Sequence, residues 1–152
     1  MPFYFFDTSA VVKHYHTEKG TPEVDKILSE QGSSFYISRL STVEVQSVFA
    51  QKVRTQAIAI QDLQKLQKLF ASDVASRLLQ VLRMLQGHYR EAERLLKKHA
   101  PAKSFRTLDA LQLAFALDLH RRGLLNHFVC ADTRFCVVAQ DEGLSVINPE
   151  HT

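Results

Sequence analysis

The sequence predicts an α/β fold, a three-layer α/β/α sandwich with a central, mostly parallel sheet. Short and uninterrupted apolar runs, such as Phe3–Phe6, have the composition of strands that are buried on both faces. Stretches with the helical spacing of apolar residues, such as the one after Thr107, alternate with these runs along the chain. Strands that alternate with helices imply right-handed crossovers, and therefore a parallel sheet that helices cover on both faces.

Local signals place the elements of the first half. Thr8 is a candidate cap for a short helix, and Thr21 with Pro22 is typical of the start of a longer one. Ser41 and Glu44 have the spacing of a capping box. The expected elements are a strand at 3–6, a helix from 8, a helix from 21 to about 30, a strand at 35–38, a helix after 41 and a helix over 62–70.

The second half of the chain continues the alternation of strands and helices, after a stretch whose conformation the sequence does not decide. Residues 78–85 fit an extended or a helical conformation equally well. Thr107 is a candidate cap for the most regular helix of the chain, which Gly123 ends. The expected elements are helices at 88–98 and from 107, a strand at 128–131, a helix at 134–142 and a strand at 145–147.

The composition suits a single domain over residues 1–152. With 45% hydrophobic and 23% charged residues, the chain is too apolar for disorder. Cys130 and Cys136 are too few for a disulfide framework. No apolar run approaches the roughly 18 residues that cross a bilayer, and the apolar start meets Asp7 too early for a signal peptide. We therefore expect a reduced, cytoplasmic protein that does not engage a membrane.

Charge is distributed unevenly along the chain, although its net value is only +3. Residues 51–106 hold twelve Lys or Arg against four Asp or Glu, whereas the rest of the chain holds seven basic and twelve acidic residues. A basic segment of this kind attracts a phosphate backbone or simply forms solvated helix faces, and the sequence favours neither.

Four acids stand at the ends of predicted elements. Asp7 closes the first strand, Glu44 lies in the first turn after the second strand, Asp109 lies in the first turn of the most regular helix, and Asp132 follows the third strand. The carboxyl ends of parallel strands and the helix starts that follow them share one edge of a sheet, where ligands bind. We therefore expect the four carboxylates to meet in one pocket.

Clustered carboxylates repel one another unless a cation neutralises them, and oxygen ligands favour Mg²⁺ or Mn²⁺. Such a site activates water and stabilises charge on a phosphoryl oxygen. Each acid taken alone also fits a structural role, as a cap or as a partner of a helix dipole. Arg106 and Arg134 flank the third and fourth acids and are candidates for positioning a phosphate.

Four stretches resemble the PIN domain family, and more narrowly its bacterial VapC-type toxin ribonucleases. They are FFDTSAVVKHY at the start, then STVEVQSVF, RTLDALQLAFAL and VCADTRFCVVAQDEGLSVINPE. The resemblance implies an endonuclease that cleaves single-stranded RNA, with Asp7, Glu44, Asp109 and Asp132 around one or two Mg²⁺ or Mn²⁺ ions. It also implies a homodimer and inhibition by a small antitoxin. Ser9 matches a polar position of the family and is, with Arg106 and Arg134, a candidate for positioning the substrate, whereas Cys130 stands where the family usually has Thr or Ser.

Two other functions remain open. A PIN-like protein that binds RNA or a protein partner without useful cleavage fits the same motifs. A phosphatase of the haloacid dehalogenase type also begins with a strand and an Asp, but it would need a second Asp where Ser9 stands. The sequence contains no phosphate-binding loop, dinucleotide fingerprint or serine-hydrolase elbow.

Overall fold

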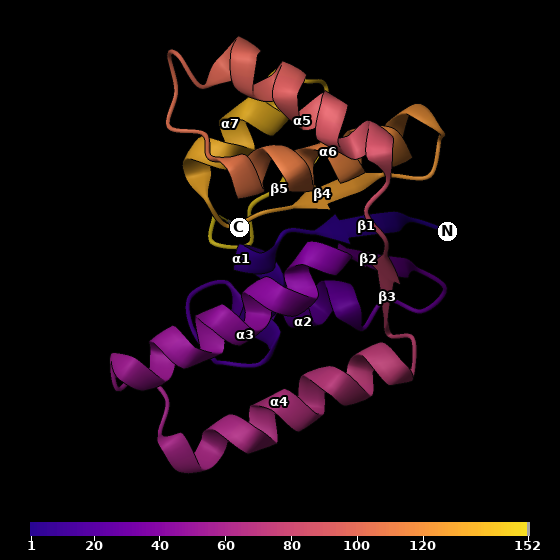
Figure 1. Ribbon diagram of the computed structural model, residues 1–152. Helices are drawn as coiled ribbons and strands as arrows, with labels where there is room; N and C mark the ends of the chain where they lie inside the picture. The colour runs from indigo at the N-terminus through magenta and orange to yellow at the C-terminus, as the bar shows by residue number, and fades with distance from the viewer. Residues whose placement is uncertain (152) are drawn as a thin grey trace.

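The computed structural model describes residues 1–151 as a parallel sheet between two layers of helices (Figure 1). The five strands lie in the order β3-β2-β1-β4-β5, and every neighbouring pair is parallel. The strands are β1 (Phe3–Phe6), β2 (Ser34–Ser38), β3 (Leu79–Leu82), β4 (His127–Val129) and β5 (Val146–Ile147). The predicted three-layer α/β/α sandwich is therefore confirmed.

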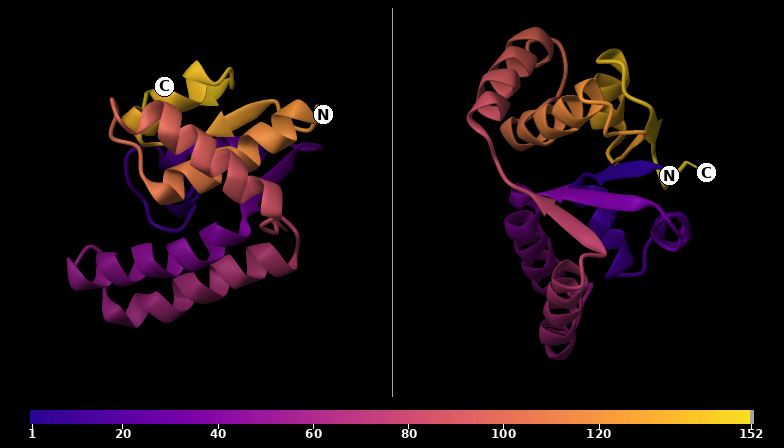
Figure 2. Two further views of the ribbon diagram at one scale, coloured as in Figure 1. Left: turned by 45° about the horizontal axis from the view of Figure 1, so that its top comes forward. Right: turned by 90° about the vertical axis from the view of Figure 1, so that its right-hand side faces the viewer.

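The helices divide between the two faces of the sheet. They are α1 (Thr8–Val11), the 3-10 helix η1 (Val12–His14), α2 (Thr21–Leu28), α3 (Arg39–Arg54), α4 (Ile60–Ala75), α5 (Gln86–His99), α6 (Thr107–Arg121) and α7 (Thr133–Asp141). The first five lie on one face and α5, α6 and α7 on the other, and the α3–α4 pair extends away from the sheet (Figure 2). None of these helices, in the part of the chain that is described, is long and apolar enough to cross a membrane.

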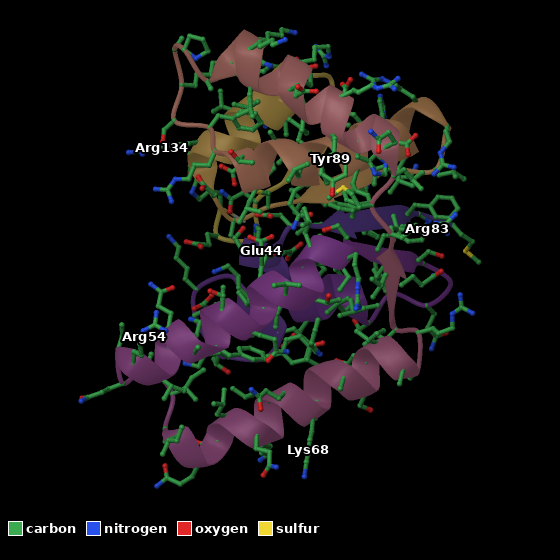
Figure 3. The ribbon with its side chains drawn as sticks, viewed as in Figure 1. Glu44, Arg54, Lys68, Arg83, Tyr89 and Arg134 are labelled. Carbon is green, nitrogen blue, oxygen red and sulfur yellow. The ribbon has the colours of Figure 1, made fainter. Side chains whose placement is uncertain are left out.

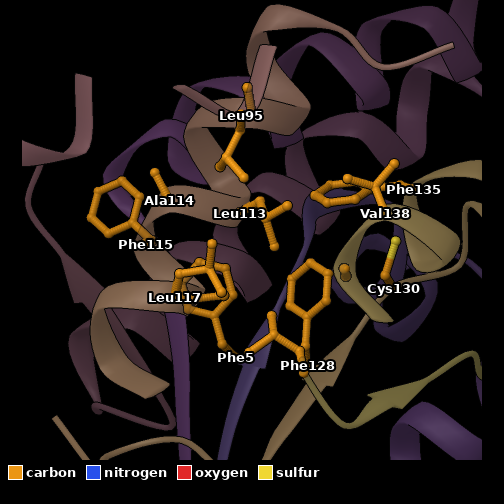
Figure 4. Packing of buried hydrophobic residues seen from close by; sticks show 14 of the residues in the cluster. Phe5, Leu95, Leu113, Ala114, Phe115, Leu117, Phe128, Cys130, Phe135 and Val138 are labelled. Carbon is orange, nitrogen blue, oxygen red and sulfur yellow. The ribbon is translucent and has the colours of Figure 1, made fainter. Parts of the chain in front are cut away.

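The alternation of side chains along β1 explains its continuous apolar sequence. Phe5 packs with residues of α5, α6 and α7, among them Leu95, Phe115 and Phe135 (Figure 4). Tyr4 and the other residues of β1 that point the opposite way join the second core, under α1 to α4. Because each face of the central strand is covered by its own layer of helices, every position of the strand favours an apolar side chain.

Three of the predicted helix caps are wrong. The N-cap of α3 is Ser38, whose Oγ accepts a hydrogen bond from the Ser41 backbone N–H at 3.3 Å, so Ser41 and Glu44 do not form a capping box. Asp7 and not Thr8 precedes α1, and α6 follows Arg106 and begins at Thr107. Thr8 and Thr107 are thus the first residues of their helices and not the caps, and α3 begins at Arg39, before the predicted cap Ser41, because the chain turns directly out of β2.

The open stretch at 78–85 contains an edge strand, and the helix predicted over 62–70 is longer at both ends. Tyr36 and Ser38 of β2 pair with Gln80 and Leu82 of β3. The sequence around β3 has no clear period, so pairing with β2 decides its conformation. The long helix α4 buries only Phe70 completely, and it lies alongside α3.

The strand order reverses beside β1, between β2 on one side and β4 on the other. At such a switch point the connections leave in opposite directions, and a crevice opens at the carboxyl ends of the strands. Asp7 follows β1, and its backbone N–H donates to the Val129 carbonyl of β4 at 2.9 Å. The first and fourth of the predicted site residues therefore follow the two strands that border this crevice.

Candidate active site

Asp7 is a buried carboxylate held in place by a hydroxyl group. Its side chain lies at the end of β1, where the residue is 6% exposed, and its Oδ2 accepts a hydrogen bond from Ser9 Oγ at 2.7 Å. Burial raises the pKa of Asp7 from 3.8 to about 6; the Ser9 hydrogen bond opposes this shift, and the charges of Glu44 and Asp109 add to it. Asp7 therefore carries a negative charge that its surroundings disfavour.

Glu44 is positioned by a buried polar network that joins three helices. Its Oε1 accepts hydrogen bonds from Thr8 Oγ1 of α1 at 3.0 Å and from Gln112 Nε2 of α6 at 2.9 Å. Gln112 is 1% exposed, lies 2.9 Å from Ser41 Oγ and accepts a hydrogen bond from Ser38 Oγ at 2.8 Å. The network holds one carboxylate oxygen in a fixed place, since every buried polar partner in it is bonded.

Asp109 lies in the first turn of α6, half-buried, one turn before Gln112. Its Oδ2 accepts a hydrogen bond from the Arg106 backbone N–H at 3.0 Å, so it caps the helix. Burial raises the pKa of Asp109, the Arg106 hydrogen bond opposes this shift, and the charges of Asp132 and Glu44 add to it. Asp109 thus interacts electrostatically with Asp7, Glu44 and Asp132.

Asp132 is exposed and caps α7. Its Oδ1 accepts hydrogen bonds from the backbone N–H groups of Arg134 at 3.0 Å and of Phe135 at 3.3 Å.

The thiol of Cys130 lies 3.6 Å from Asp7 Oδ2. A thiol is a weak hydrogen-bond donor, so this contact adds little to the binding of the Asp7 carboxylate. The strong hydrogen bond to Asp7 comes from the Ser9 hydroxyl. Ser9 Oγ is itself held in place, because it accepts a hydrogen bond from the Ala131 backbone N–H at 3.1 Å.

Together these four carboxylates, Asp7, Glu44, Asp109 and Asp132, form what we call the acid basin. Within residues 1–151, none of the four makes an ion pair with a Lys, Arg or His. Uncompensated charge of this kind fits a hard divalent cation.

The side chains of the acid basin do not form a complete set of metal ligands. In the described chain, no group of three or more His, Cys, Asp or Glu side chains stands ready to hold one. Mg²⁺ does not need such a cage, since it keeps several waters and takes one or two carboxylates from the protein. The all-oxygen donor set of the acid basin therefore fits Mg²⁺ or Mn²⁺.

Two hollows meet at Asp132. The first hollow, of about 440 Å³, runs from Ser9 and Asp132 toward Gln51 and Lys52 of α3. The second hollow, of about 480 Å³, is lined by Ser104, Arg106, Asp109, Asp132, Thr133 and Arg134. Figure 3 shows Glu44 on the side of α3 that faces the upper layer, from which Arg134 projects, and Arg54 at the far end of α3. Both predicted phosphate-positioning arginines thus line the second hollow.

Sequence reasoning missed several residues that shape this site. Gln112 is a polar residue inside an otherwise apolar helix, and that contrast was a usable signal. Ser38 and Ser41 gave a signal only for capping. Lys13 is 4% exposed and ion-paired, and nothing in the local sequence distinguishes it from a surface lysine.

Comparisons with known proteins give the family and the fold. The sequence matches the PIN domain family over residues 4–141. No curated protein matches it significantly. The fold is similar to that of VapC20 from Mycobacterium tuberculosis, described as a Sarcin-Ricin loop cleaving toxin, with a TM-score of 0.69 at 14% identity over 96% of this chain and 99% of that one.

Two further solved structures are similar. The match to VapBC2 from Rickettsia felis, bound to a DNA fragment from its promoter, has a TM-score of 0.64 at 15% identity over 96% of this chain and 98% of that one. The match to FitAcB from Neisseria gonorrhoeae has a TM-score of 0.59 at 16% identity over 98% and 99%. At these identities, the likeness establishes a shared fold.

Proposed function

This chain belongs to the PIN domain family, and from that membership we propose that it is a metal-dependent endoribonuclease that cleaves single-stranded RNA. The observation that carries the proposal is the acid basin. Its carboxylates come from separate parts of the chain, lie beside the switch point of the sheet and lack a cationic partner within residues 1–151. A fold keeps such a costly arrangement most readily where it serves a function.

The four carboxylates take different parts in the proposed reaction. Asp7 and Asp109 would hold Mg²⁺ or Mn²⁺ directly, and Glu44 and Asp132 would act mainly through waters. When bound, the ion supplies charge stabilisation at the scissile phosphate and lowers the pKa of water. Ser9 keeps Asp7 in orientation through its 2.7 Å hydrogen bond. Arg106 and Arg134 would bind the phosphate oxygens from the second hollow.

We further propose that the protein is the toxin of a type II toxin–antitoxin pair. The structural relatives include VapBC2, FitAcB and a toxin–antitoxin complex from Klebsiella pneumoniae, which support a small antitoxin as the partner. A homodimer belongs to the same proposal. Because its substrate would be cellular RNA, we expect the protein to act in the cytoplasm.

A second candidate is a PIN-like module that binds RNA or a partner without useful cleavage. The observation that favours it is the thiol of Cys130 beside Asp7, where the family usually has a hydroxyl. The haloacid dehalogenase-like phosphatase loses its support, because the family match is to the PIN domain and Ser9 bonds to Asp7 where a second Asp would be needed.

Cleavage of an unstructured RNA by the purified protein separates these candidates. We expect internal cleavage with Mg²⁺ or Mn²⁺ that a chelator abolishes. Asp7→Asn should lower the rate at least about a hundredfold. Glu93→Gln, which changes an exposed acid of α5 that makes no ion pair within residues 1–151, is the matched control. RNA binding without cleavage would favour the second candidate, and cleavage that persists in Asp7→Asn would contradict the assigned site.

A further inference from the structure

We propose that the first hollow is a base-recognition subsite, in which the side-chain amide of Gln51 reads the edge of one nucleobase of the bound RNA. This inference rests on the proposed function, because it takes single-stranded RNA to be the molecule that crosses the acid basin. It goes beyond that function by assigning a preference for one base of the RNA to the first hollow.

The position of the first hollow suits a nucleotide beside the scissile phosphate. Ser9, which donates to Asp7, lines it, and Asp132 lines both hollows. A strand with a phosphate at the acid basin therefore lies next to both hollows. At about 440 Å³, the first hollow falls within the size range of small-ligand pockets.

The charges of the first hollow are already satisfied. Lys13 Nζ lies 3.1 Å from Glu18 and 2.9 Å from Glu150, and Lys52 Nζ lies 2.8 Å from Glu18. Burial alone would raise the pKa of Glu18, but the hydrogen bonds and charges of the two lysines outweigh it and lower the pKa. Both lysines are thus neutralised by carboxylates, and the hollow is a poor phosphate site.

The second hollow has the opposite character. Arg106 and Arg134 are exposed and make no ion pair within residues 1–151. Free guanidinium groups bind phosphate oxygens in a bidentate way, and contacts to phosphate carry no base information. The two hollows therefore have different roles in the proposal: the second hollow binds phosphate and the first recognises a base.

The walls of the first hollow match a base. Val12, Val48 and Ala131 offer apolar surface, on which the flat face of a base is stabilised. The side-chain amide of Gln51 projects from α3 and makes no hydrogen bond within the described chain; the nearby Thr55 hydroxyl donates instead to the Gln51 backbone carbonyl at 3.0 Å. A glutamine amide carries both a donor and an acceptor, which is the pair that distinguishes one base edge from another.

The test is the base preference of the cuts. The full chain is incubated with Mg²⁺ and an unstructured RNA pool of random sequence, and the ends are sequenced. We expect one position next to the cut to show a preference, and Gln51→Ala should reduce that preference at least about fivefold. Gln46→Ala, on an exposed part of the same helix and outside the hollow, should leave it unchanged.

A second variant fills the hollow from an exposed position. Ala57→Trp places a large ring in the space and should lower cleavage of all sequences and flatten the preference. No base preference in the parent protein would overturn the subsite. A preference that survives in both Gln51→Ala and Ala57→Trp would also overturn it, as expected if the hollow serves a protein partner instead.

A binding measurement keeps the subsite testable if the parent does not cleave RNA, an outcome that would refute the proposed activity alone. The affinities of the metal-free chain for six-nucleotide homopolymers of A, C, G and U are compared by fluorescence anisotropy. Unequal affinities that become equal in Gln51→Ala but not in Gln46→Ala would support the subsite. Equal affinities in the parent, or no binding, would overturn it.

Discussion

The molecule holds buried carboxylates in two regions, the acid basin and the space between α5 and α7. In the second region, which we call the Glu142 network, the carboxylate of Glu142 lies 2.8 Å from Arg94 Nη2, 2.7 Å from Lys98 Nζ and 2.8 Å from His99 Nε2. Burial alone would raise the pKa of Glu142, but these three partners outweigh it and lower the pKa to about 2. Asp7, which is 6% exposed, lacks such partners within residues 1–151 and has a pKa raised to about 6.

The two regions differ in how the cost of burying a charge is offset. Burying a charge is costly, and partners with good geometry offset the cost. The Glu142 network joins α7 to α5 in this way, and its cations come from the basic segment 51–106, so part of that basic excess is structural. The acid basin has no such partners within residues 1–151, which is the pattern that we expect of the proposed metal site.

Removing the charge of Asp7 is the strongest test of this comparison. We expect Asp7→Asn to raise the free energy of unfolding by about 2 kcal/mol at pH 7.5 without divalent ions, because the ionised form is disfavoured in the folded protein. Urea denaturation measures this change, with Glu93→Gln as the control, which should stay within about 0.5 kcal/mol of the parent. A destabilised Asp7→Asn protein would show that the acid basin is not strained.

The same kind of change in the Glu142 network should have the opposite sign. Glu142→Gln removes the charge that Arg94, Lys98 and His99 share, so we expect the free energy of unfolding to fall by about 2 kcal/mol. RNA cleavage per folded molecule should stay at the parent level, since Glu142 is not part of the site. Unchanged stability would mean that the network is held too loosely to matter.

The two regions should also respond to pH in different windows. For Asp7, the unfolded chain ionises near its ordinary pKa of 3.8 and the folded chain only near 6, so stability falls as the pH rises between these values. For Glu142, the contribution is present above 4.5 and is lost as the pH falls toward about 2. The stability difference between parent and variant should change by about 1 kcal/mol per pH unit inside each window.

Urea denaturation of the parent, Asp7→Asn and Glu142→Gln from pH 3 to 7 measures both windows. The advantage of Asp7→Asn should grow from about pH 4 to 6, and the deficit of Glu142→Gln should shrink below about pH 4.5. If the free energies of unfolding of the parent and of both variants changed with pH in the same way, the predicted difference between the two regions would be wrong.

A divalent cation should stabilise the acid basin and leave the Glu142 network unaffected. At about ten times its dissociation constant, Mg²⁺ or Mn²⁺ should add about 1 kcal/mol to the stability of the parent and of Glu142→Gln. The gain should be much smaller for Asp7→Asn. Thermal denaturation at constant ionic strength, adjusted with KCl, measures it; an equal gain for all three proteins would indicate non-specific binding.

The smallest expected effect sharpens the contrast between paired and unpaired cations. Arg134→Ala, in the second hollow, should weaken RNA binding about threefold for all sequences and reduce the salt slope by about 0.7. Lys98→Ala, whose amine is already paired with Glu142, should leave the slope unchanged. Fluorescence anisotropy across a KCl series measures both; equal slopes for the two variants would show that pairing does not decide which cations meet RNA.

The sequence by itself determined the architecture and the placement of the four acids along it. The apolar run of β1 requires burial on both faces, and the alternation of strands and helices leaves a parallel sheet as the consistent solution. Asp7 and Asp132 follow strands, and Asp109 lies in the first turn of a helix, so the edge they share follows from the fold class. The apolar run, the alternation of elements and the positions of the acids are local or periodic patterns, so they can be recognised in a single sequence.

Only the tertiary structure decided which charges are paired and which remain free. Arg94 meets Glu142 across 48 residues of sequence, and Gln112 meets Thr8 across 104. The conformation of β3 and the cap of α3 likewise depend on pairing with β2 and on the turn at its end. The physical reason is that ion pairing and hydrogen bonding in a buried site depend on distances between elements, which residue spacing does not specify.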